Sequence, residues 1–547
     1  MYNYPIIILM LSRLEKQTFR SEIFQHLDGI VTCPTAYALY EKGVLEYILK
    51  KEKVDLTELV AEFQANEGYL NVALHVLSGQ GWLVPHLNNE KDIISYSTTE
   101  QSAIAFELIP LYKEVVEMIK FSEKYHPRKF EVAPFRKLER IFEKYIQQYG
   151  IVLSTDESIR SVQQQVLKHI EGLLVGPTVV MLGMTGMFHK YFMEASFRPD
   201  EFHKDPESFK KILDFFSFLG WFTSKNETYR FTEKGLFFAR RASAYGVTVS
   251  YIPMMRRLDD LIFGDPNTLR DTKIGEAEKH VDREMNVWGS GGAHSTYFKI
   301  VDEIIIDIFN RPIDEQPRGI LDMGCGNGAF LQHIFEVIDR KTLRGEMLEE
   351  YPLSLVGVDY NEAALKVTRA NLIKSDIWAK VLWGDIGRPD VLAQTLEEDY
   401  NIDLKNLLNV RTFLDHNRIW EAPAHPSENR KSDSAGAFAD RGKRISNALV
   451  EDSLFEHLKN WQPFVEQFGL LVIELHTISP TLIAKNLGKT AATAYNATHG
   501  FSDQYILEID SFIKIAKEVG LTPDPRFQRK FPDSELATVS INLLKGE

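Results

Sequence analysis

The stretch from Gly319 to Phe330, which reads G-I-L-D-M-G-C-G-N-G-A-F, constrains the fold of this chain more than any other. Its apolar start predicts the buried end of a parallel strand. Gly324, Gly326 and Gly328 then allow a tight turn in which the backbone approaches a ligand closely. Apolar residues at helical spacing from Ala329 to Ile338 predict the next helix. This order of strand, glycine turn and helix predicts a nucleotide-like ligand at the N-terminus of that helix.

The spacing of the glycines indicates which ligand this is. The dinucleotide fingerprint places its last two glycines three residues apart, whereas this turn reads G-x-G-x-G after an acidic residue. The difference favours S-adenosylmethionine over NAD. The cofactor contacts predicted in this stretch are Asp322, Gly324, Gly326, Asn327 and Gly328.

Two further apolar strands follow, and each ends in an acidic residue. Leu355–Asp359 places Asp359, followed by Tyr360, where a carboxylate would bind both ribose hydroxyls. Lys380–Asp385 ends in a segment suited to the adenine amino group and ring, and its predicted contacts are Gly384, Asp385 and Ile386. A single such acid is also a plausible helix N-cap, but three at consecutive strand ends beside the glycines favour a cofactor site in a Rossmann-like α/β domain.

Polar residues also follow the fourth and fifth predicted strands. The fourth, Asn406–Arg411, runs into the segment Thr412–Arg418, and the fifth, Gly469–His476, ends in Glu474 and His476. Ligands bind at the carboxyl edge of open parallel sheets, so these side chains converge there. Arg411 is assigned to the cofactor. A metal or acid–base site is expected from Asp415, His416, His476, His499 and Gln504, and this mixture without cysteine suits iron or manganese better than zinc.

Composition narrows the class of protein. The 547 residues carry 63 basic and 77 acidic side chains, and the net charge of −14 disfavours non-specific binding to nucleic acid. The two cysteines, Cys33 and Cys325, cannot form a disulfide framework, so a reducing cytoplasm is expected. The apolar run Pro5–Leu11 lacks the flanks of a signal peptide and is too short to span a membrane, so residues 1–20 are predicted to be an N-terminal arm.

The N-terminal half repeats itself. His26–Thr35 aligns without a gap on His169–Thr178, at an offset of 143 residues. Each copy reads as helices followed by a hairpin, which predicts two winged-helix-like repeats at 21–150 and 151–278. Winged helices commonly read DNA, but the candidate second helices, Glu67–Leu77 and Pro206–Leu219, carry few cations for phosphates. A scaffold is therefore favoured, either as a cap over the catalytic core or as a dimer face.

Two segments beside the core are less regular. The Gly/Ser-rich segment from His280 to Phe298 is predicted to be a loop, either a cofactor lid using His294 and Tyr297 or a plain linker. The core is expected to span 279–547 with an insertion at about 417–460. Five cations of this insertion are candidates for a basic patch that meets an acidic carrier protein: Arg430, Lys431, Arg441, Lys443 and Arg444.

Several motifs together resemble the N-terminal methyltransferase domain of the polyketide-synthase-like loading modules that make saxitoxin and apratoxin starter units. They are N-V-x-G-S-G from Asn286, D-M-G-C-G from Asp322, G-V-D-Y-N from Gly357, G-D-I-G from Gly384, F-L-D-H from Phe413 and G-F-S-x-Q-Y from Gly500. The resemblance implies a seven-stranded class I methyltransferase core preceded by a mainly α-helical tandem winged-helix-like cap.

The resemblance also implies an activity, namely metal-dependent C-methylation of a malonyl group on an acyl carrier protein. Iron or manganese would rest on His476 and Gln504, with Asp415 or His416 nearby, and the carrier would be supplied in trans. His416 or His499 would remove the proton from the carbon that is methylated.

Two alternatives remain open. One is O-methylation of a small phenol, with His476 as a base and no metal. The other is a regulator that binds S-adenosylmethionine through the core and DNA through the winged helices; the acidic charge balance disfavours it.

Overall fold

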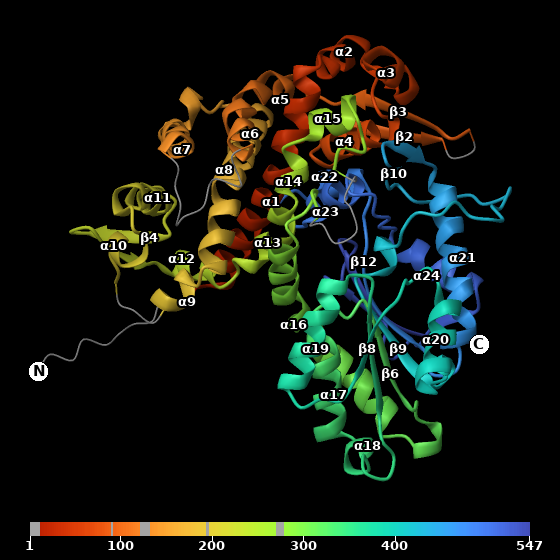
Figure 1. The fold of residues 1–547 in the computed structure, drawn as a ribbon. Helices are drawn as coiled ribbons and strands as arrows, with labels where there is room; N and C mark the ends of the chain where they lie inside the picture. Colours follow the sequence, from red (N-terminus) through yellow and green to blue (C-terminus); the bar gives the residue numbers. More distant parts are fainter. Residues whose placement is uncertain (1–10, 89–90, 121–131, 193–195, 270–277, 547) are drawn as a thin grey trace, which may run out of the picture.

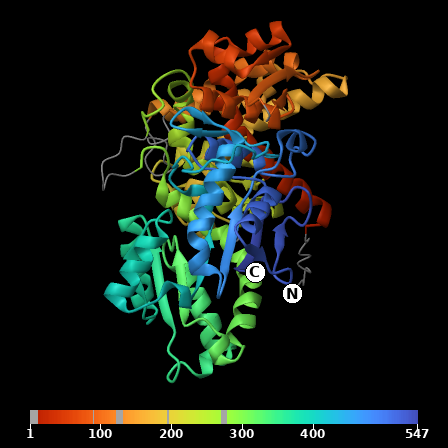
Figure 2. The same cartoon turned by 90° about the vertical axis from the view of Figure 1, so that its right-hand side faces the viewer.

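The computed structural model describes residues 11–88, 91–120, 132–192, 196–269 and 278–546. Residues 1–10, the first half of the predicted N-terminal arm, lie outside them. A mainly helical cap, formed by the N-terminal half of the chain, lies above a sheet domain formed by the C-terminal half (Figures 1 and 2). Both cysteines are free and buried.

The sheet domain confirms the predicted Rossmann-like class I methyltransferase fold. Its strands follow the order β13-β15-β12-β9-β6-β7-β8, and β14 pairs with β15 at one edge. β15 runs antiparallel to β12, whereas the neighbours from β12 to β8 are parallel. β7 and β8 are added on one side of β6, and β9 and β12 on the other, so the strand order reverses between β6 and β9. Open α/β sheets bind ligands at such a switch point. The strands are β6 (Gly319–Met323), β7 (Ser354–Asp359), β8 (Lys380–Trp383), β9 (Leu407–Thr412), β12 (Leu470–Leu475), β13 (Leu521–Pro523), β14 (Arg529–Phe531) and β15 (Val539–Gly546).

Helices cover both faces of this sheet because its strands are apolar on both sides. One face packs in a single buried cluster with α16 (Arg283–Phe309), α17 (Ala329–Lys341) and α19 (Glu362–Lys374). The other packs with α20 (Pro389–Tyr400), α21 (Asn447–Val465) and α24 (Ile509–Glu518). The predicted insertion at 417–460 therefore runs into a core helix, α21.

The cap contains two similar units. The first has a three-stranded sheet in the order β1-β3-β2, and the second has the hairpin β4-β5 with a bridge from Phe197 to Tyr229. The first unit comprises α1 (Arg13–Glu41), α2 (Val44–Lys51), β1 (Lys53–Asp55), α3 (Leu56–Phe63), α4 (Glu67–Gly79), β2 (Leu83–Asn88), β3 (Ile93–Thr98), α5 (Ser102–Leu108), α6 (Lys113–Ile119) and α7 (Val132–Ile146). The second comprises α8 (Glu157–Met184), α9 (Met187–Phe192), α10 (Pro199–Phe202), α11 (Pro206–Phe218), β4 (Phe222–Lys225), β5 (Thr228–Phe231), α12 (Glu233–Ala239), α13 (Ser243–Ser250), α14 (Ile252–Met255) and α15 (Leu258–Phe263).

The aligned segments of the repeat form the crossing of α1 and α8. Gly29 lies against the backbone of His169, and Gly172 lies against the backbone of His26, so each helix meets the other at equivalent positions. α8 is long and apolar enough to cross a membrane by composition, but 78% of its most apolar window is buried within the protein. Its hydrophobicity is explained by this packing.

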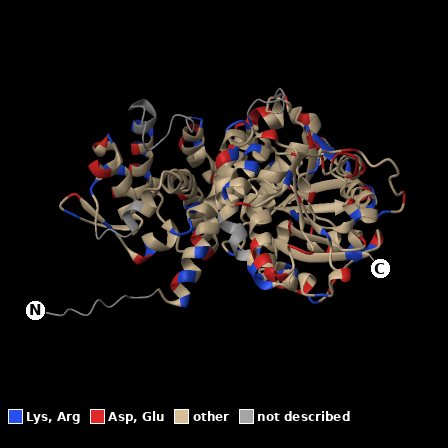
Figure 3. Ribbon diagram, turned by 60° about the horizontal axis from the view of Figure 1, so that its bottom comes forward, with Lys and Arg blue, Asp and Glu red and all other residues tan. Residues whose placement is uncertain are grey.

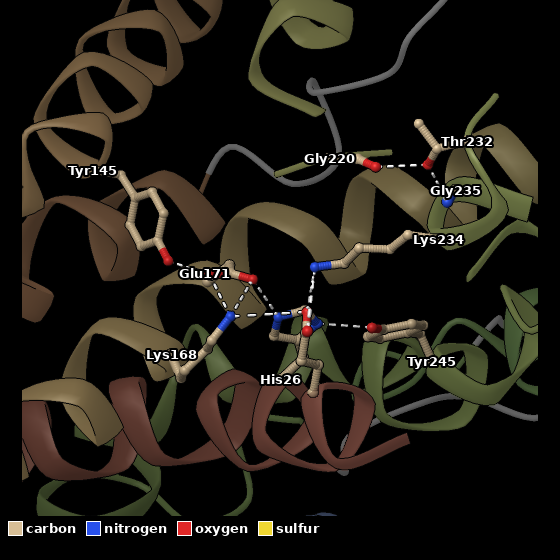
Figure 4. Close-up of polar contacts among 10 residues, drawn as sticks. His26, Tyr145, Lys168, Glu171, Gly220, Thr232, Lys234, Gly235 and Tyr245 are labelled. Atoms are coloured by element: carbon tan, nitrogen blue, oxygen red, sulfur yellow. Dashed lines mark hydrogen bonds and ion pairs between the residues drawn. The ribbon is translucent and has the colours of Figure 1, made fainter. Parts of the chain in front are cut away.

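Each aligned histidine makes equivalent contacts. His26 Nδ1 lies 2.8 Å from the Tyr245 hydroxyl, and His169 Nδ1 lies 2.7 Å from the Tyr112 hydroxyl. Figure 4 shows His26 between Tyr245 and Glu171, whose carboxylate lies 2.9 Å from His26 Nε2. Burial opposes ionisation of Glu171, but His26 and its neighbouring donors hold its pKa below the usual range. The polar groups at this crossing satisfy one another inside the cap.

The predicted loop at 280–298 is instead the first half of α16. A Cβ on Gly289 would lie 2.6 Å from the backbone nitrogen of Val247, and one on Gly246 would lie 2.5 Å from the Cα of Gly289. The glycines therefore permit close approach of α16 and α13. The prediction was wrong because glycine required for helix packing and glycine required for a loop look alike in sequence.

This crossing provides a matched test of stability. We expect Gly289→Ala to lower the free energy of unfolding by roughly 1–3 kcal/mol, because its new Cβ meets backbone atoms that cannot rotate away. Gly291→Ala lies in the same helix with nothing within 4 Å of its Cβ, and we expect no loss or a gain of up to ~1 kcal/mol. Chemical denaturation of both variants checks this; equal midpoints would contradict the packing role of Gly289.

The segment after β9 ties the core to the cap. A hairpin of β10 (Phe438–Asp440) and β11 (Lys443–Ile445) packs on α4, where the backbone N–H of Gly68 donates to Gly442 O at 2.8 Å. α22 (Pro480–Ala484) and α23 (Ala492–Gly500) contact α4 as well. From Gly68 to Gly79 every residue of α4 is buried. The second helix of the first winged-helix unit therefore faces the catalytic domain.

Two of the five cations predicted to form a basic patch here have acidic partners within the chain. Arg444 pairs with Glu67 and Asp92 of the cap, at 2.8 and 2.6 Å. Arg430 pairs with Asp452 and with Glu518. Figure 3 shows Lys and Arg interspersed with Asp and Glu over the ribbon. These two arginines stabilise contacts of the inserted segment.

Candidate active site

The glycine turn after β6 has the backbone conformation that its sequence requires. Gly324, Gly326 and Gly328 have φ values of +79°, +56° and +78°, a region that side chains disfavour. Gly328 is also the N-cap of α17, so that helix begins directly after the turn. A Cβ on Gly324 would lie 2.9 Å from the side chain of Leu414, which follows β9. The absence of a side chain at Gly324 therefore lets the turn pack against Leu414.

Two acidic residues lie beside the turn. Asp359 accepts hydrogen bonds from the backbone N–H of Gly326 at 2.9 Å and of Asn361 at 2.8 Å. Asp322 is buried, and burial together with the charge of Asp359 raises its pKa to about 7. Burial also raises the pKa of Asp359, opposed by its N–H donors and by Arg283 of α16. The start of α16 therefore lies close to the predicted ribose-binding carboxylate.

The adenine side of the predicted cofactor site carries an aromatic pair. The rings of Tyr360 and Trp383 lie 5.4 Å apart, and Trp383 Nε1 donates to Tyr360 O at 2.9 Å. Both rings are exposed. Asp385 accepts from the Gly387 N–H at 2.8 Å, and Ile386 O accepts from the indole of Trp461. Trp383 was not among the predicted contacts, although its place directly before Gly384 was visible in the sequence.

Removing the Asp359 carboxylate is expected to weaken cofactor binding. We expect Asp359→Ala to reduce the affinity for S-adenosylmethionine by about 2 kcal/mol, the scale of a hydrogen bond to a charged group. Titration calorimetry measures this, and Asp399→Ala, an exposed acid at the end of α20, is the control. Unchanged affinity in a folded Asp359 variant would show that the ribose lies elsewhere.

At the ends of β9 and β12, on the side of β6 away from β7 and β8, a histidine and a glutamate lie in contact. His416 follows β9 in a short 3-10 turn, Asp415–Asn417, and Glu474 belongs to β12. His416 Nδ1 contacts Glu474 Oε1, and Glu474 also accepts from the backbone N–H groups of Asp415 at 2.8 Å and Leu475 at 2.7 Å. This fixes the ring, and Nε2 has no hydrogen-bond partner among the described residues. Nε2 is thus the nitrogen available to a substrate.

Asp415 lies beneath this pair. Its carboxylate accepts from Arg411 at 2.5 Å and lies 2.9 Å from His457 Nε2. Burial opposes ionisation of Asp415, but Arg411 and His457 outweigh it and hold its pKa below the usual range. Arg411 is fully buried and stacks over Trp461, so the structure places it against Asp415. His457 was not predicted, because it lies within a helix, α21, where the sequence carries no motif that marks a site residue.

The other predicted side chains take different positions. His476 lies between Leu507 O at 3.0 Å and Ser540 Oγ at 2.7 Å, and burial lowers its pKa to about 4. Gln504 donates to the Tyr251 hydroxyl at 3.0 Å and to Ser502. The ring of His499 lies 5.1 Å from that of His416, and burial lowers the pKa of His499 to about 3.

A small cavity joins several of these groups at the carboxyl edge of β9 and β12. It is lined by Asp415, His416, Arg418, Leu454, Glu474, Leu475, His476, Tyr505, Leu507 and Phe512. The structure thus brings together Asp415, His416 and His476, three of the five side chains predicted to converge. Gln504 does not line this cavity, and His499 approaches it only through His416.

The predicted iron or manganese site is not supported by the grouping of its donors. Across the described ranges no three His, Cys, Asp or Glu side chains are grouped for a metal. Both ring nitrogens of His476 have protein partners, and Gln504 Nε2 donates to two hydroxyls. Asp415 Oδ1 is bound by Arg411 and His457, whereas its Oδ2 has no hydrogen-bond partner among the described residues.

The cap contributes a side chain to the edge of the site. Tyr251, between α13 and α14, receives the hydrogen bond of Gln504, and its ring lies 6.4 Å from that of His499. No sequence pattern links position 251 to position 504, so this contact was not predicted. Tyr297, proposed for the lid, packs on Phe413 and Phe531. The side chain of His294, the other lid candidate, lies outside the described residues.

Comparison with known families assigns three parts of the chain. Residues 278–542 match the AprA MT2-like domain, residues 171–265 the AprA winged helix domain and residues 19–85 the AprA N-terminal domain. A search of curated protein sequences found no match.

Solved structures similar to the chain include three proteins at low identity. The mitomycin 7-O-methyltransferase MmcR is 10% identical, with 71% of this chain and 99% of that chain covered and a TM-score of 0.40. LepI in complex with SAM is 10% identical, with 81% and 99% covered and a TM-score of 0.39. The CurJ carbon methyltransferase is 11% identical, with 81% and 99% covered and a TM-score of 0.31.

The three family matches occur in chain order, and the last includes the glycine turn, the acidic strand ends and the His416–Glu474 pair. The chain therefore belongs to the AprA-like methyltransferases and is an S-adenosylmethionine-dependent methyltransferase that carries the family's N-terminal and winged-helix domains.

Proposed function

We propose that this methyltransferase transfers a methyl group to the α carbon of a malonyl-type thioester held on an acyl carrier protein. The observation that carries the proposal is the His416–Glu474 pair, which lies at the carboxyl edge of the sheet next to the glycine turn. A carbon acid requires a base, and a histidine held by a carboxylate provides one. The malonyl-type substrate is inferred from the family to which the chain belongs.

The reaction follows from these groups. His416 Nε2 removes a proton from the carbon between the thioester and the carboxylate, and its imidazolium is stabilised by Glu474. The resulting carbanion attacks the methyl carbon of S-adenosylmethionine in line. One C–C bond forms, the sulfur–methyl bond breaks, and S-adenosylhomocysteine leaves with the electron pair. The proton on His416 then passes to solvent.

Metal assistance is not a step of this proposal. The family resemblance implies iron or manganese, but both ring nitrogens of His476 are bound by protein groups, and the described residues hold no group of three His, Cys, Asp or Glu side chains placed for a metal. His476 is also a poor candidate for the base of phenol O-methylation, because Leu507 O and Ser540 Oγ occupy its two nitrogens. His416 is the better base for either substrate.

The proposed partner is an acidic carrier protein supplied in trans, and nucleic acid is not a proposed partner. α4 is buried against the catalytic domain. On α11 both lysines have acidic partners, Lys210 with Asp214 and Lys211 with Glu139. These helices offer little positive charge to phosphates.

A panel of acceptors tests the proposal. The protein is incubated with labelled S-adenosylmethionine and with malonyl-, methylmalonyl- or acetyl-carrier protein, and mass is measured on the carrier. We expect a 14-Da increase, the mass of one methylene by ordinary arithmetic, on the malonyl-type carriers first. Label on free phenols and on no carrier would overturn the proposal in favour of O-methylation. A gel shift with random DNA at low salt covers the regulatory alternative.

A further inference from the structure

Arg418 is a buried cation that no carboxylate pairs with directly. It follows the 3-10 turn of Asp415, and Nη1 donates to Asp415 O at 2.9 Å. Nη2 donates to Val450 O at 3.4 Å and Ser453 Oγ at 3.3 Å. Its Nε has no partner among the described residues, and only 6% of the side chain is exposed. All its hydrogen-bond acceptors are therefore neutral oxygens.

Among the nearby carboxylate oxygens, Asp415 Oδ2 has no hydrogen-bond partner in the described residues, and the others bind groups other than Arg418. Asp415 binds Arg411 and His457, and Glu474 binds His416 and two backbone N–H groups. Burial lowers the pKa of Arg418 to about 10, so the guanidinium remains charged at neutral pH. The charges of Asp415 and Glu474 offset part of this burial, but neither carboxylate accepts a hydrogen bond from Arg418. A buried cation is costly unless its donors are satisfied, and a ligand oxygen would satisfy the donor left over.

Arg418 and His416 line the same small cavity. When His416 takes a proton from the substrate carbon, the negative charge moves onto the thioester oxygen as an enolate. The imidazolium has Glu474 beside it, so the enolate oxygen needs a separate positive partner. A preorganised cation at such a position stabilises developing charge strongly in a water-poor site.

We propose that Arg418 binds the thioester oxygen and stabilises the enolate, the role that the family resemblance gave to a metal ion. This rests on the proposed function. The C–H bond breaks, its electron pair delocalises onto the oxygen facing Arg418, and the charge is lost when the carbon takes the methyl group. The substrate class is thereby an enolisable thioester whose carbonyl oxygen enters the cavity.

Arg344 is a matched control for the structural cost of removing a buried arginine. It is also buried and is bound only by neutral acceptors: Gln316 Oε1, Pro317 O and Tyr351 O. Every nitrogen-bearing arm of Arg344 has an acceptor, and it precedes β7 at the opposite edge of the sheet. Arg344→Gln should therefore alter stability without altering enolate formation.

The test measures α-hydrogen exchange of malonyl-carrier protein in D2O with the full-length enzyme, together with the rate of methyl transfer. We expect Arg418→Gln to slow both by about 10²–10³-fold and Arg418→Lys to retain part of each, while S-adenosylmethionine affinity stays unchanged. Arg344→Gln should keep both rates. If Arg418→Gln is too unstable to assay, the Arg418→Lys variant and its thermal midpoint decide the question.

Chelation separates this inference from a metal-dependent reaction. We expect wild-type activity to survive a chelator. Activity lost with chelator and restored by iron or manganese would overturn the role of Arg418 while keeping the proposed function. Full activity of Arg418→Gln on a malonyl-carrier would do the same. Absence of methyl transfer by the wild type to any carrier would instead contradict the proposed function itself.

Discussion

His416→Ala is expected to reduce the rate of methyl transfer about 10³-fold, within the range for loss of a positioned general base. Glu474 holds Nδ1 of this ring, so Nε2 is the atom that reaches the substrate. The glycines and acids predicted to bind the cofactor follow β6, β7 and β8, so S-adenosylmethionine affinity should not change. Initial rates with labelled cofactor, combined with calorimetry, check both expectations.

Two further variants make the assignment of the base specific. Glu474→Gln should also lower the rate, since a neutral amide stabilises the imidazolium less well. His333→Ala, on α17 beside Asp302 and outside the cavity, should be as active as wild type. A normal rate for His416→Ala with a large loss for His499→Ala would transfer the role of base to His499.

Gly172→Ala is expected to lower the apparent free energy of unfolding of the cap by about 3 kcal/mol, the upper end of the usual cost of overpacking. A Cβ at this position would lie 2.3 Å from His26 O and 2.7 Å from its Cα. Neither atom can rotate away, so α1 and α8 must separate. Thermal and chemical denaturation monitored by circular dichroism measure the loss.

Gly176→Ala in the same helix is the control. Its Cβ would meet chiefly the side chain of Ile30, the tip of which lies 2.6 Å away and can change rotamer. We expect a smaller loss than at Gly172. If both variants were equally stable, the crossing of the two repeats would not depend on backbone contact at Gly172.

The sheet could be predicted because most of its parallel strands share one simple sequence pattern. An apolar run followed by an acid or a histidine marks β6, β7, β8 and β12 within a residue or two, and a similar run followed by polar residues marks β9. The glycine turn also stands out, because three alternate glycines have few structural uses. The repeated segment at His26 and His169 predicted two equivalent units, and these residues now lie at one helix crossing.

The remaining features depend on contacts between distant segments. The sequence placed His476 at the correct edge of the sheet but gave no sign that Leu507 and Ser540 bind both its nitrogens. Tyr251 and His457 reach the site from a cap connection and a core helix, where single polar residues are common. Local patterns specify elements and edges, whereas tertiary packing decides which donors remain free.

The position of the transferred methyl group tests the central claim most directly. The enzyme is supplied with S-adenosylmethionine labelled with carbon-13 in its methyl group and with malonyl-carrier protein, and the product is examined by carbon NMR after cleavage of the thioester. We predict a methyl signal coupled to the malonyl α carbon. A methyl group on oxygen, or no labelled methyl on any carrier-bound acyl group while free phenols are labelled, would contradict the account.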